Sequence, residues 1–338
     1  MTNHRKVFLG VLCSAAATLA RRKSAVAFCL TLLAILALAA SAPVLAQGQP
    51  GFVWAPTAFQ YDNGAQPSVA VSGPTIVEVH QGEAGALWYH TGEIQPNGTV
   101  RWASTAFQYD NGFQPSVAVS GPTIVEVHQG EAGALWYHTG EIQPNGIVRW
   151  AFTAFQYDNG FQPSVAVSGP TIVEVHQGEA GALWYHMGQI KSDGTVTWAP
   201  NAFQYDNGTQ PSVALAGSTI LEVHQGEAGA LWYHTGEIQP NGTVRWASTA
   251  FQYDNGFLPS VALSGPTIVE VHQADDGVGP LWYHTGGIRA NGTASWAKTA
   301  FQFDAGATPR IALAGPKMIN VHQADAGVGP LWYHTGSY

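Results

Sequence analysis

The chain has 338 residues, of which 46% are hydrophobic and 10% are charged, with a formal net charge of −9 at pH 7. All 22 acidic residues but only 8 of the 13 basic ones follow position 46, so residues 47–338 carry a formal charge of −14. Such an acidic chain repels phosphate backbones, which argues against nucleic acid as a partner.

The first 46 residues have the pattern of a secretory signal peptide. Basic residues at 21–23 precede an apolar run at 25–40, and small residues follow at 42–46. The run is short for a membrane span, so we predict a secreted, extracellular protein with no membrane insertion after signal removal. Cys13 and Cys29 both lie in this leader. The mature chain must therefore be stabilised by a packed core and not by disulfides.

The rest of the chain consists of six tandem repeats of one segment. The period is 48 residues, with one step of 50, and it predicts a solenoid, a propeller or an array. The repeat is marked by a Trp-Ala dipeptide that begins at Trp54, Trp102, Trp150, Trp198, Trp246 and Trp296.

Four short apolar segments divided by turn signals make up each repeat. In the first copy they are 67–73, 75–81, 86–91 and 99–103, and the last follows the hairpin sequence Pro-Asn-Gly. No window carries a helical apolar stripe. Each repeat therefore reads as a four-stranded antiparallel meander, the unit of a β-propeller blade.

The two ends of the chain indicate how the repeats close. Residues 52–55 match a fourth strand with no preceding three, and residues 331–336 match a third strand with no fourth. A solenoid would instead need polar caps. We predict an all-β, six-bladed propeller over 47–338, closed by the N-terminal strand in the last blade. The blades are expected at 67–103, 115–151, 163–199, 211–247, 259–297, and 309–338 with 51–55.

The parity of the second hairpin decides which side chains share a face. A two-residue turn would place Val77 opposite His90. Glu78 and His80 would then lie on one face of the blade, and Trp88 and His90 on the other. Opposite faces of neighbouring blades meet in a ring, so polar groups would recur in every seam.

One rim of the propeller should gather polar and aromatic residues. The connection between blades, at 60–64, and the hairpin at 80–85 are expected at the same end. Polar groups beside aromatic rings suit the hydroxyls and C–H faces of a sugar. The candidate ligand-binding residues are Tyr61, Asp62, Asn63, His80, Gln81 and Trp88, with Tyr109, Asp110, Asn111, His128, Trp136, Tyr157, Asp158, Asn159, His176, Trp184, Tyr205, Asp206, Asn207, His224, Trp232, Tyr253, Asp254, Asn255, His272 and Trp282.

These residues also have structural explanations. Asp-Asn-Gly is by nature a turn sequence. Glu78 and the histidines could be satisfied polar groups that fix the packing, and the Trp-Ala tryptophans would fill the space between blades. His80 and His90 are expected on opposite faces, so we predict no shared metal and no cofactor.

Enzymatic signatures are weak. Neither a Gly-x-Ser-x-Gly elbow nor a phosphate loop occurs, and residues 192–198 are similar to a sialidase Asp-box without its spacing. The sixth repeat diverges most, with Ala305 for Asn, Arg310 for Ser and Asn320 for Glu. If the Asn and Glu contact a ligand, five working sites remain.

The order Pro-Ser-Val-Ala, Ile-Val-Glu-Val-His, Leu-Trp-Tyr-His and Val-Arg-Trp resembles the blade repeat of the Photorhabdus-type fucose-binding propeller lectins. The resemblance covers all six repeats and implies sugar binding in pockets between blades. We therefore expect a multivalent, non-catalytic carbohydrate-binding protein whose partners are glycans or glycoconjugates. A protein-interaction or structural propeller is the alternative, followed by a glycoside hydrolase.

Overall fold

Each repeat folds into antiparallel strands, as its β-branched and alternating segments predict. The structure, a computed structural model, describes residues 50–338, and the predicted signal peptide lies outside them. In the first repeat β2 (Phe59–Ser72) turns into β3 (Thr75–Gln81) at Gly73, whose φ of +57° glycine adopts without strain. The short turn η1 (Glu83–Gly85) leads to β4 (Ala86–Ile94), and β5 (Val100–Trp102) follows.

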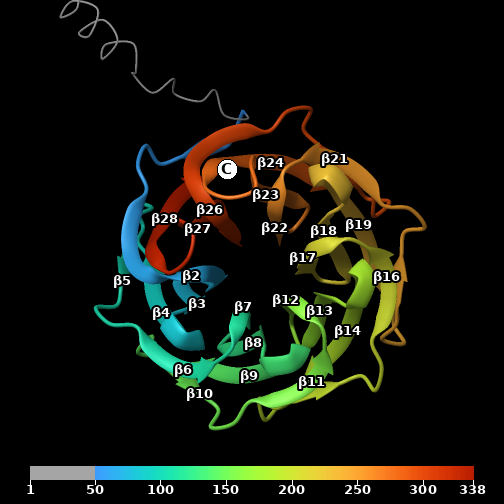
Figure 1. The fold of residues 1–338 in the computed structure, drawn as a ribbon, viewed down its shortest axis with the longest axis horizontal. Coiled ribbons are helices and arrows are strands. Elements are labelled where there is room, and N and C mark those ends of the chain that lie inside the picture. Colours follow the sequence, from blue (N-terminus) through green and yellow to red (C-terminus); the bar gives the residue numbers. More distant parts are fainter. Residues whose placement is uncertain (1–49) are drawn as a thin grey trace, which may run out of the picture. The chain divides into compact units, whose positions relative to one another are not determined.

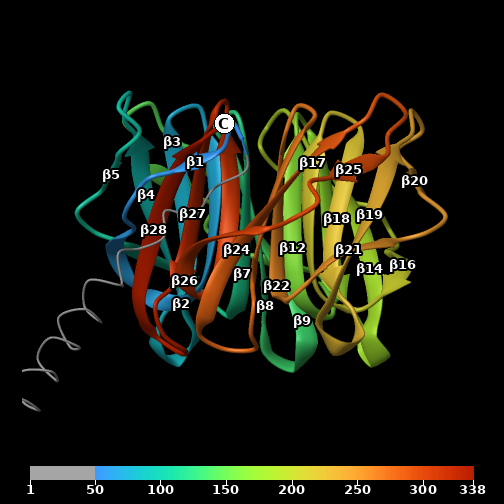
Figure 2. The same ribbon diagram turned by 90° about the horizontal axis from the view of Figure 1, so that it is seen from above.

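The other repeats keep this order, and Figure 2 shows their strands running between two rims of turns. The strands are β6 (Phe107–Asn111), β7 (Phe113–Ser120), β8 (Thr123–Gln129), β9 (Ala134–Ile142), β10 (Val148–Trp150), β11 (Phe155–Asn159), β12 (Phe161–Ser168), β13 (Thr171–Gln177), β14 (Ala182–Ile190), β15 (Val196–Trp198), β16 (Phe203–Asn207), β17 (Thr209–Ala216), β18 (Thr219–Gln225), β19 (Ala230–Ile238), β20 (Val244–Trp246), β21 (Phe251–Asn255), β22 (Phe257–Ser264), β23 (Thr267–Gln273), β24 (Gly279–Ile288), β25 (Ala294–Trp296), β26 (Phe301–Ala314), β27 (Lys317–Gln323) and β28 (Gly329–Ser337), with short 3₁₀ turns η2 (Glu131–Gly133), η3 (Glu179–Gly181) and η4 (Glu227–Gly229).

The hairpin between β3 and β4 corrects the predicted faces. It is one residue longer than the turn that we predicted, because η1 forms a single 3₁₀ turn. His80 therefore pairs with Trp88, and Glu78 pairs with His90. Directly paired residues share a face of the sheet. The prediction that Trp88 and His90 lie on the face opposite to Glu78 and His80 is wrong, and all four lie together.

The Gln-Tyr-Asp-Asn segment is a strand and not the connecting loop that its sequence suggests. β6 pairs with the first half of β4, Phe107 opposite Tyr89, while β5 pairs with the second half. A register shift between Leu87 and Trp88 accommodates the extra residue in β6. The ring centroids of Tyr89 and Phe107 are 5.8 Å apart. This cross-strand aromatic contact outweighs the turn preference of Asp-Asn-Gly.

The strand β1 (Val53–Trp54) pairs with β28, near the other end of the chain. Trp54 lies opposite Gly336, just as Trp102 lies opposite Gly92 in the first repeat. β1 therefore takes the place that β5 takes on β4. Figure 1 shows the first long strand of each repeat toward the centre, with the short pieces at the periphery.

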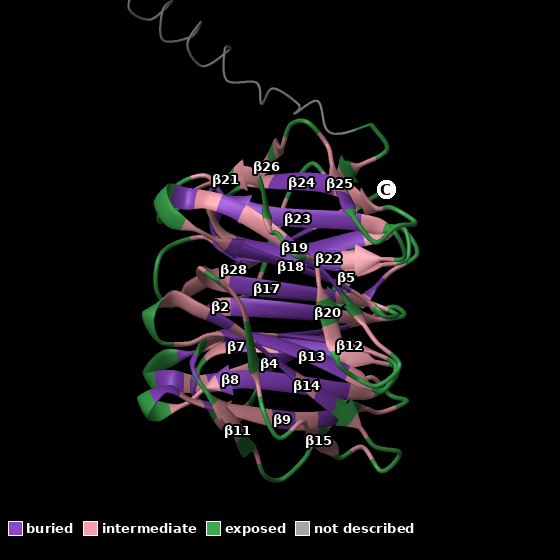
Figure 3. Ribbon diagram, turned by 90° about the vertical axis from the view of Figure 1, so that its right-hand side faces the viewer, coloured by how far each residue is buried: buried purple, intermediate pink, exposed green. Residues whose placement is uncertain are grey.

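The core lies between consecutive repeats. One apolar cluster joins Val69 and Ile76 of the first repeat to Ile319 and Val321 of the sixth, so these two repeats pack as neighbours. Figure 3 shows the buried strands inside and the exposed turns at both rims. Each fully buried Val or Ile contributes roughly 1.5–3 kcal/mol relative to exposure. The Trp-Ala tryptophans pack against six such clusters, which is the structural role that we assigned to them.

We expect Trp54→Ala to lower the free energy of unfolding by about 3 kcal/mol, measured by urea denaturation. The indole stacks on Phe303 with ring centroids 4.4 Å apart, and it packs on the core of the last two repeats. Phe152→Ala is the control, because Phe152 is fully exposed. A loss for Trp54→Ala as small as that of the control would show that β1 contributes nothing to the fold.

Candidate ligand-binding site

A chain of acidic and histidine side chains recurs in each of the first five repeats, and its aspartate comes from the segment that pairs with the neighbouring sheet. In the first repeat, Glu78 Oε2 lies 3.0 Å from Nδ1 of His80, and Asp62 Oδ2 lies 2.9 Å from Nδ1 of His90. Nε2 of His90 lies 2.7 Å from the carbonyl oxygen of Ala103. Both nitrogens of this ring face acceptors, which favours the doubly protonated imidazolium.

The aspartate connects the two histidines of its repeat. In the second repeat, Asp110 Oδ2 lies 4.0 Å from Nε2 of His128 and 3.4 Å from Nδ1 of His138. The two histidines of a repeat were expected on opposite faces, whereas the structure places both beside one carboxylate. Burial opposes ionisation of Asp110, but hydrogen bonds from His138 and the Asn111 N–H outweigh it and lower the pKa of Asp110.

A buried tyrosine and glutamate lie at the inner end of this chain. Glu78 is fully buried, and the Tyr61 hydroxyl lies beside it. Burial, and then the Glu78 charge, raise the pKa of Tyr61 well above its ordinary value. Burial alone would lower the pKa of His80, but the Glu78 carboxylate more than offsets this and raises the pKa of His80.

The sixth repeat lacks both members of that buried pair. Phe303 replaces the tyrosine and Asn320 replaces the glutamate. The Asn320 amide oxygen still lies 2.8 Å from Nδ1 of His322, but it carries no charge. Burial therefore lowers the pKa of His322 to about 4, although Asp304 acts in the opposite direction. The glutamate thus decides whether this histidine is charged near neutral pH.

A pocket of about 420 Å³ opens at the end of this chain in the fifth repeat. Its lining includes five of the predicted residues, together with Lys298 and the segment after it. Asp254 keeps 26% of its side-chain surface exposed, although both histidines lie nearby. Asn255 is exposed, while His272 is 2% exposed. The predicted residues that meet here are Tyr253, Asp254, Asn255, His272 and Trp282.

Two predicted residue types have another role in the structure. The first-repeat tyrosine, Tyr61, stacks on Trp102 with ring centroids 4.4 Å apart, so its ring belongs to the core. Gln81 does not lie at the position that corresponds to the pocket of Asp254 and Asn255. It lines a cavity near the axis together with Gln129 and Gln177.

A second kind of pocket, which the sequence did not predict, lies near an Asn-Gly turn. A space of about 630 Å³ is lined by Glu237, Arg245 and Trp246 of the fourth repeat and by Asn291 of the fifth. Arg245 donates a hydrogen bond to Glu237 across the paired strands β19 and β20. Glu and Arg eight residues apart recur at 93 and 101 and at 141 and 149, and this spacing was the available signal.

Comparisons with known proteins show a likeness of fold. No protein-family model and no curated protein matches the sequence. The structure of the fungal Aleuria aurantia lectin, titled a six-bladed β-propeller with a novel fucose recognition mode, is 14% identical, with a TM-score of 0.55, covering 82% of this chain and 93% of that one.

Two other solved structures are similar to a comparable degree. Trypanosoma rangeli sialidase with the inhibitor DANA is 9% identical, with a TM-score of 0.54, covering 82% of this chain and 55% of that one. A putative 6-phosphogluconolactonase from Bacteroides uniformis is 12% identical, with a TM-score of 0.53, covering 75% and 77%. The chain is thus all-β, built of repeated four-stranded antiparallel sheets, with β-propeller neighbours.

Two features are absent from residues 50–338. No helix in this range is long and apolar enough to cross a membrane. No three side chains among its histidines and acidic residues are grouped so as to hold a metal ion.

Replacing Glu270 by Gln should lower the pKa of His272, because the charge that offsets burial is removed. Titration of the histidine ring signals by NMR measures this, with His322 as the reference in the same spectrum. The raised pKa of His272 adds stability that is fully present below about pH 6.5 and is lost as pH rises through the folded pKa. The variant should lack this contribution. An unchanged pKa of His272 would contradict the assigned role of Glu270.

Proposed function

We propose that the mature protein is an exported six-bladed β-propeller that binds carbohydrate in pockets between its repeats, without catalysis. The observation that carries this proposal is the pocket of Asp254, Asn255, His272 and Trp282. Pairing of β1 with β28 and packing of the first repeat on the sixth support the closed ring.

The pocket offers the groups that a sugar needs. The Asp254 carboxylate accepts hydroxyl hydrogens, and the exposed Asn255 amide both donates and accepts. Trp282 supplies an aromatic surface for C–H groups. Buried histidines fix the orientation of the aspartate, so little side-chain freedom is lost on binding.

Repetition suits attachment to a glycan-bearing surface. Asp, Asn, His and Trp occur in the first five repeats, and the sixth has Ala305 at the asparagine position. Individually weak sites gain affinity when several bind one surface at once. Near-identical copies also offer little of the asymmetry that a catalytic centre needs, which supports binding over hydrolysis. Because the repeat resembles that of fucose-binding propeller lectins, fucosylated glycans are the first ligands to test.

A protein-binding role has one observation in its favour. A phenylalanine that begins the Gln-Tyr-Asp-Asn segment of each of the first five repeats is about half exposed. Regularly spaced exposed aromatic residues are typical of interaction surfaces. These residues are Phe59, Phe107, Phe155, Phe203 and Phe251, at 54–55% exposure.

The sharpest test changes the exposed asparagine to the alanine that the sixth repeat already contains. We expect the combined Asn63, Asn111, Asn159, Asn207 and Asn255→Ala variant to lose at least tenfold in glycan affinity, on the order of 1.4 kcal/mol, while its melting temperature is nearly unchanged. Glycan-array screening followed by titration calorimetry measures this.

A matched control changes the asparagines of the Asn-Gly turns before the fourth strand, Asn97, Asn145, Asn241 and Asn291, to alanine. This variant should bind glycans like the unchanged protein. Binding that survives the fivefold change, or is lost only in the control, would place the site elsewhere. Absence of any glycan ligand, with capture of a protein that depends on Phe107, would favour the protein-binding role.

A further inference from the structure

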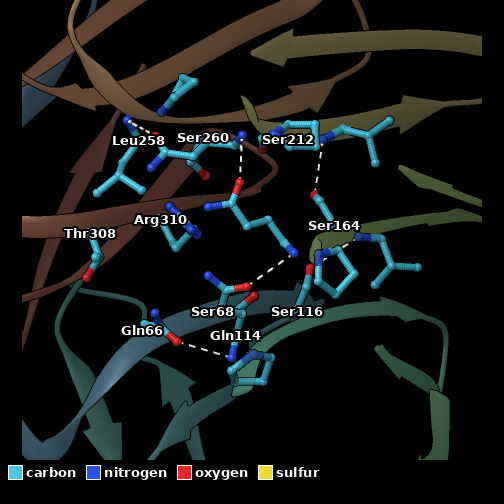
Figure 4. A pocket seen from close by; sticks show the side chains of 18 of the residues that line it. Gln66, Ser68, Gln114, Ser116, Ser164, Ser212, Leu258, Ser260, Thr308 and Arg310 are labelled. Carbon is cyan, nitrogen blue, oxygen red and sulfur yellow. Dashed lines mark hydrogen bonds between the residues drawn. The ribbon is translucent and has the colours of Figure 1, made fainter. Parts of the chain in front are cut away.

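The inner strands surround an axial cavity of about 110 Å³ that is separate from the pockets between repeats. Four glutamines form an arc around it. The Gln66 side-chain oxygen accepts the Gln114 backbone N–H at 3.1 Å, and the same bond links Gln114 to Gln162, Gln162 to Gln210, and Gln210 to Leu258. Figure 4 shows this arrangement. The oxygens are used in these bonds, whereas the amide N–H groups have no acceptor among residues 50–338.

Serines line the cavity in the same way. Ser68 Oγ accepts the backbone N–H of Val117 at 3.1 Å, and Ser116, Ser164, Ser212 and Ser260 accept the corresponding N–H of the next repeat at 3.2–3.3 Å. A serine that accepts in this way still has its O–H to donate. Within the described part of the chain, these hydroxyls donate to no other group. The wall therefore presents donors.

Arg310 occupies the serine position of the sixth repeat. Figure 4 shows its side chain inside the arc of glutamines and serines. One guanidinium nitrogen donates to the carbonyl oxygen of Pro309 at 3.0 Å. The side chains that line the cavity include no carboxylate, so nothing in its wall neutralises the positive charge. Burial lowers the pKa of Arg310 to about 10, which leaves the group protonated at neutral pH.

We propose that the axial cavity binds a small oxyanion, with phosphate and sulfate as its class, through Arg310 and the free amide and hydroxyl donors around it. Arg310 is only partly exposed, and a charge so withdrawn from water is normally paired because its desolvation is unfavourable. The planar fork of an arginine matches two oxygens of an oxyanion. The glutamine and serine donors surround the positive charge of Arg310, so the complementary ligand is an anion that accepts hydrogen bonds.

The cavity is large enough for such a ligand. Its volume of about 110 Å³, measured as the space open to the centres of water-sized molecules, is several times the roughly 10–15 Å³ that one water needs. An isolated oxyanion therefore fits in it. The acidic surface of the protein opposes the approach of any anion, but charges beyond about 8 Å are largely screened at physiological ionic strength.

The chain itself supplies the matched variant. Arg310→Ser installs the residue found in the other five repeats and offers a serine oxygen to the seam with the first repeat, so the fold should be kept. We expect phosphate to raise the melting temperature of the unchanged protein at constant ionic strength. Arg310→Ser should weaken phosphate binding at least tenfold by titration calorimetry and abolish this rise.

Two controls separate a specific site from a general charge effect. Arg289→Ser removes the same charge from an exposed turn and should bind phosphate like the unchanged protein. Arg310→Lys keeps the charge without the planar fork and should bind with intermediate affinity. Equal losses in Arg289→Ser and Arg310→Ser would overturn the proposal, as would an unchanged protein that neither phosphate nor sulfate stabilises. Glycan affinity should stay the same in Arg310→Ser.

Discussion

The turn between the second and third strands of each repeat determines which side chains can meet. Its length, with Glu83–Gly85 as a 3₁₀ turn, pairs Glu78 with His90 and His80 with Trp88. A turn one residue shorter would move half of these groups to the other face of the sheet. The acid–histidine chain, the burial of the glutamate and the opening at the aspartate all depend on this parity. The longer hairpins of the last two repeats preserve it, because they add two residues.

The sixth repeat shows how the parts of this arrangement depend on each other. Phe303 replaces the tyrosine and Asn320 replaces the glutamate. Because both change together, no buried tyrosine remains without the glutamate, and no buried glutamate remains without the tyrosine. The histidine remains, because Asn320 can still form a hydrogen bond with it. The amide nitrogen of Asn320 donates to the carbonyl oxygen of Arg310, which connects this substitution to the axial cavity. In the sixth repeat, the loss of the buried glutamate and the gain of Arg310 are thus joined by a direct hydrogen bond.

Much of the fold follows from the sequence, and the site follows in part. Turn residues and the alternation of apolar and polar residues predict the strands of each repeat. The segments at the two ends of the sequence match a fourth and a third strand, which predicts that they belong to one sheet. The parity of the hairpin is not predictable from composition, because Gly-Glu-Ala-Gly fits turns of more than one length. The Asp-Asn segment is a strand because Phe107 packs on Tyr89, and a local turn preference gives no sign of that distant contact. Tyr253, Asp254, Asn255, His272 and Trp282 line one pocket, whereas Gln81 lies at another one, and their role in ligand binding stays a prediction.

The pairing of β1 with β28 has a consequence for how the chain folds. Among the strands of residues 50–338, β1 is synthesised first, and its partner β28 is synthesised last. Contacts of such long sequence separation form slowly, since the loop they close costs entropy before any contact compensates. Until β1 has paired with it, β28 presents an unpaired edge, which is a template for pairing with another chain. Folding intermediates of this protein should therefore be vulnerable to strand exchange at one defined place, the junction of its two ends.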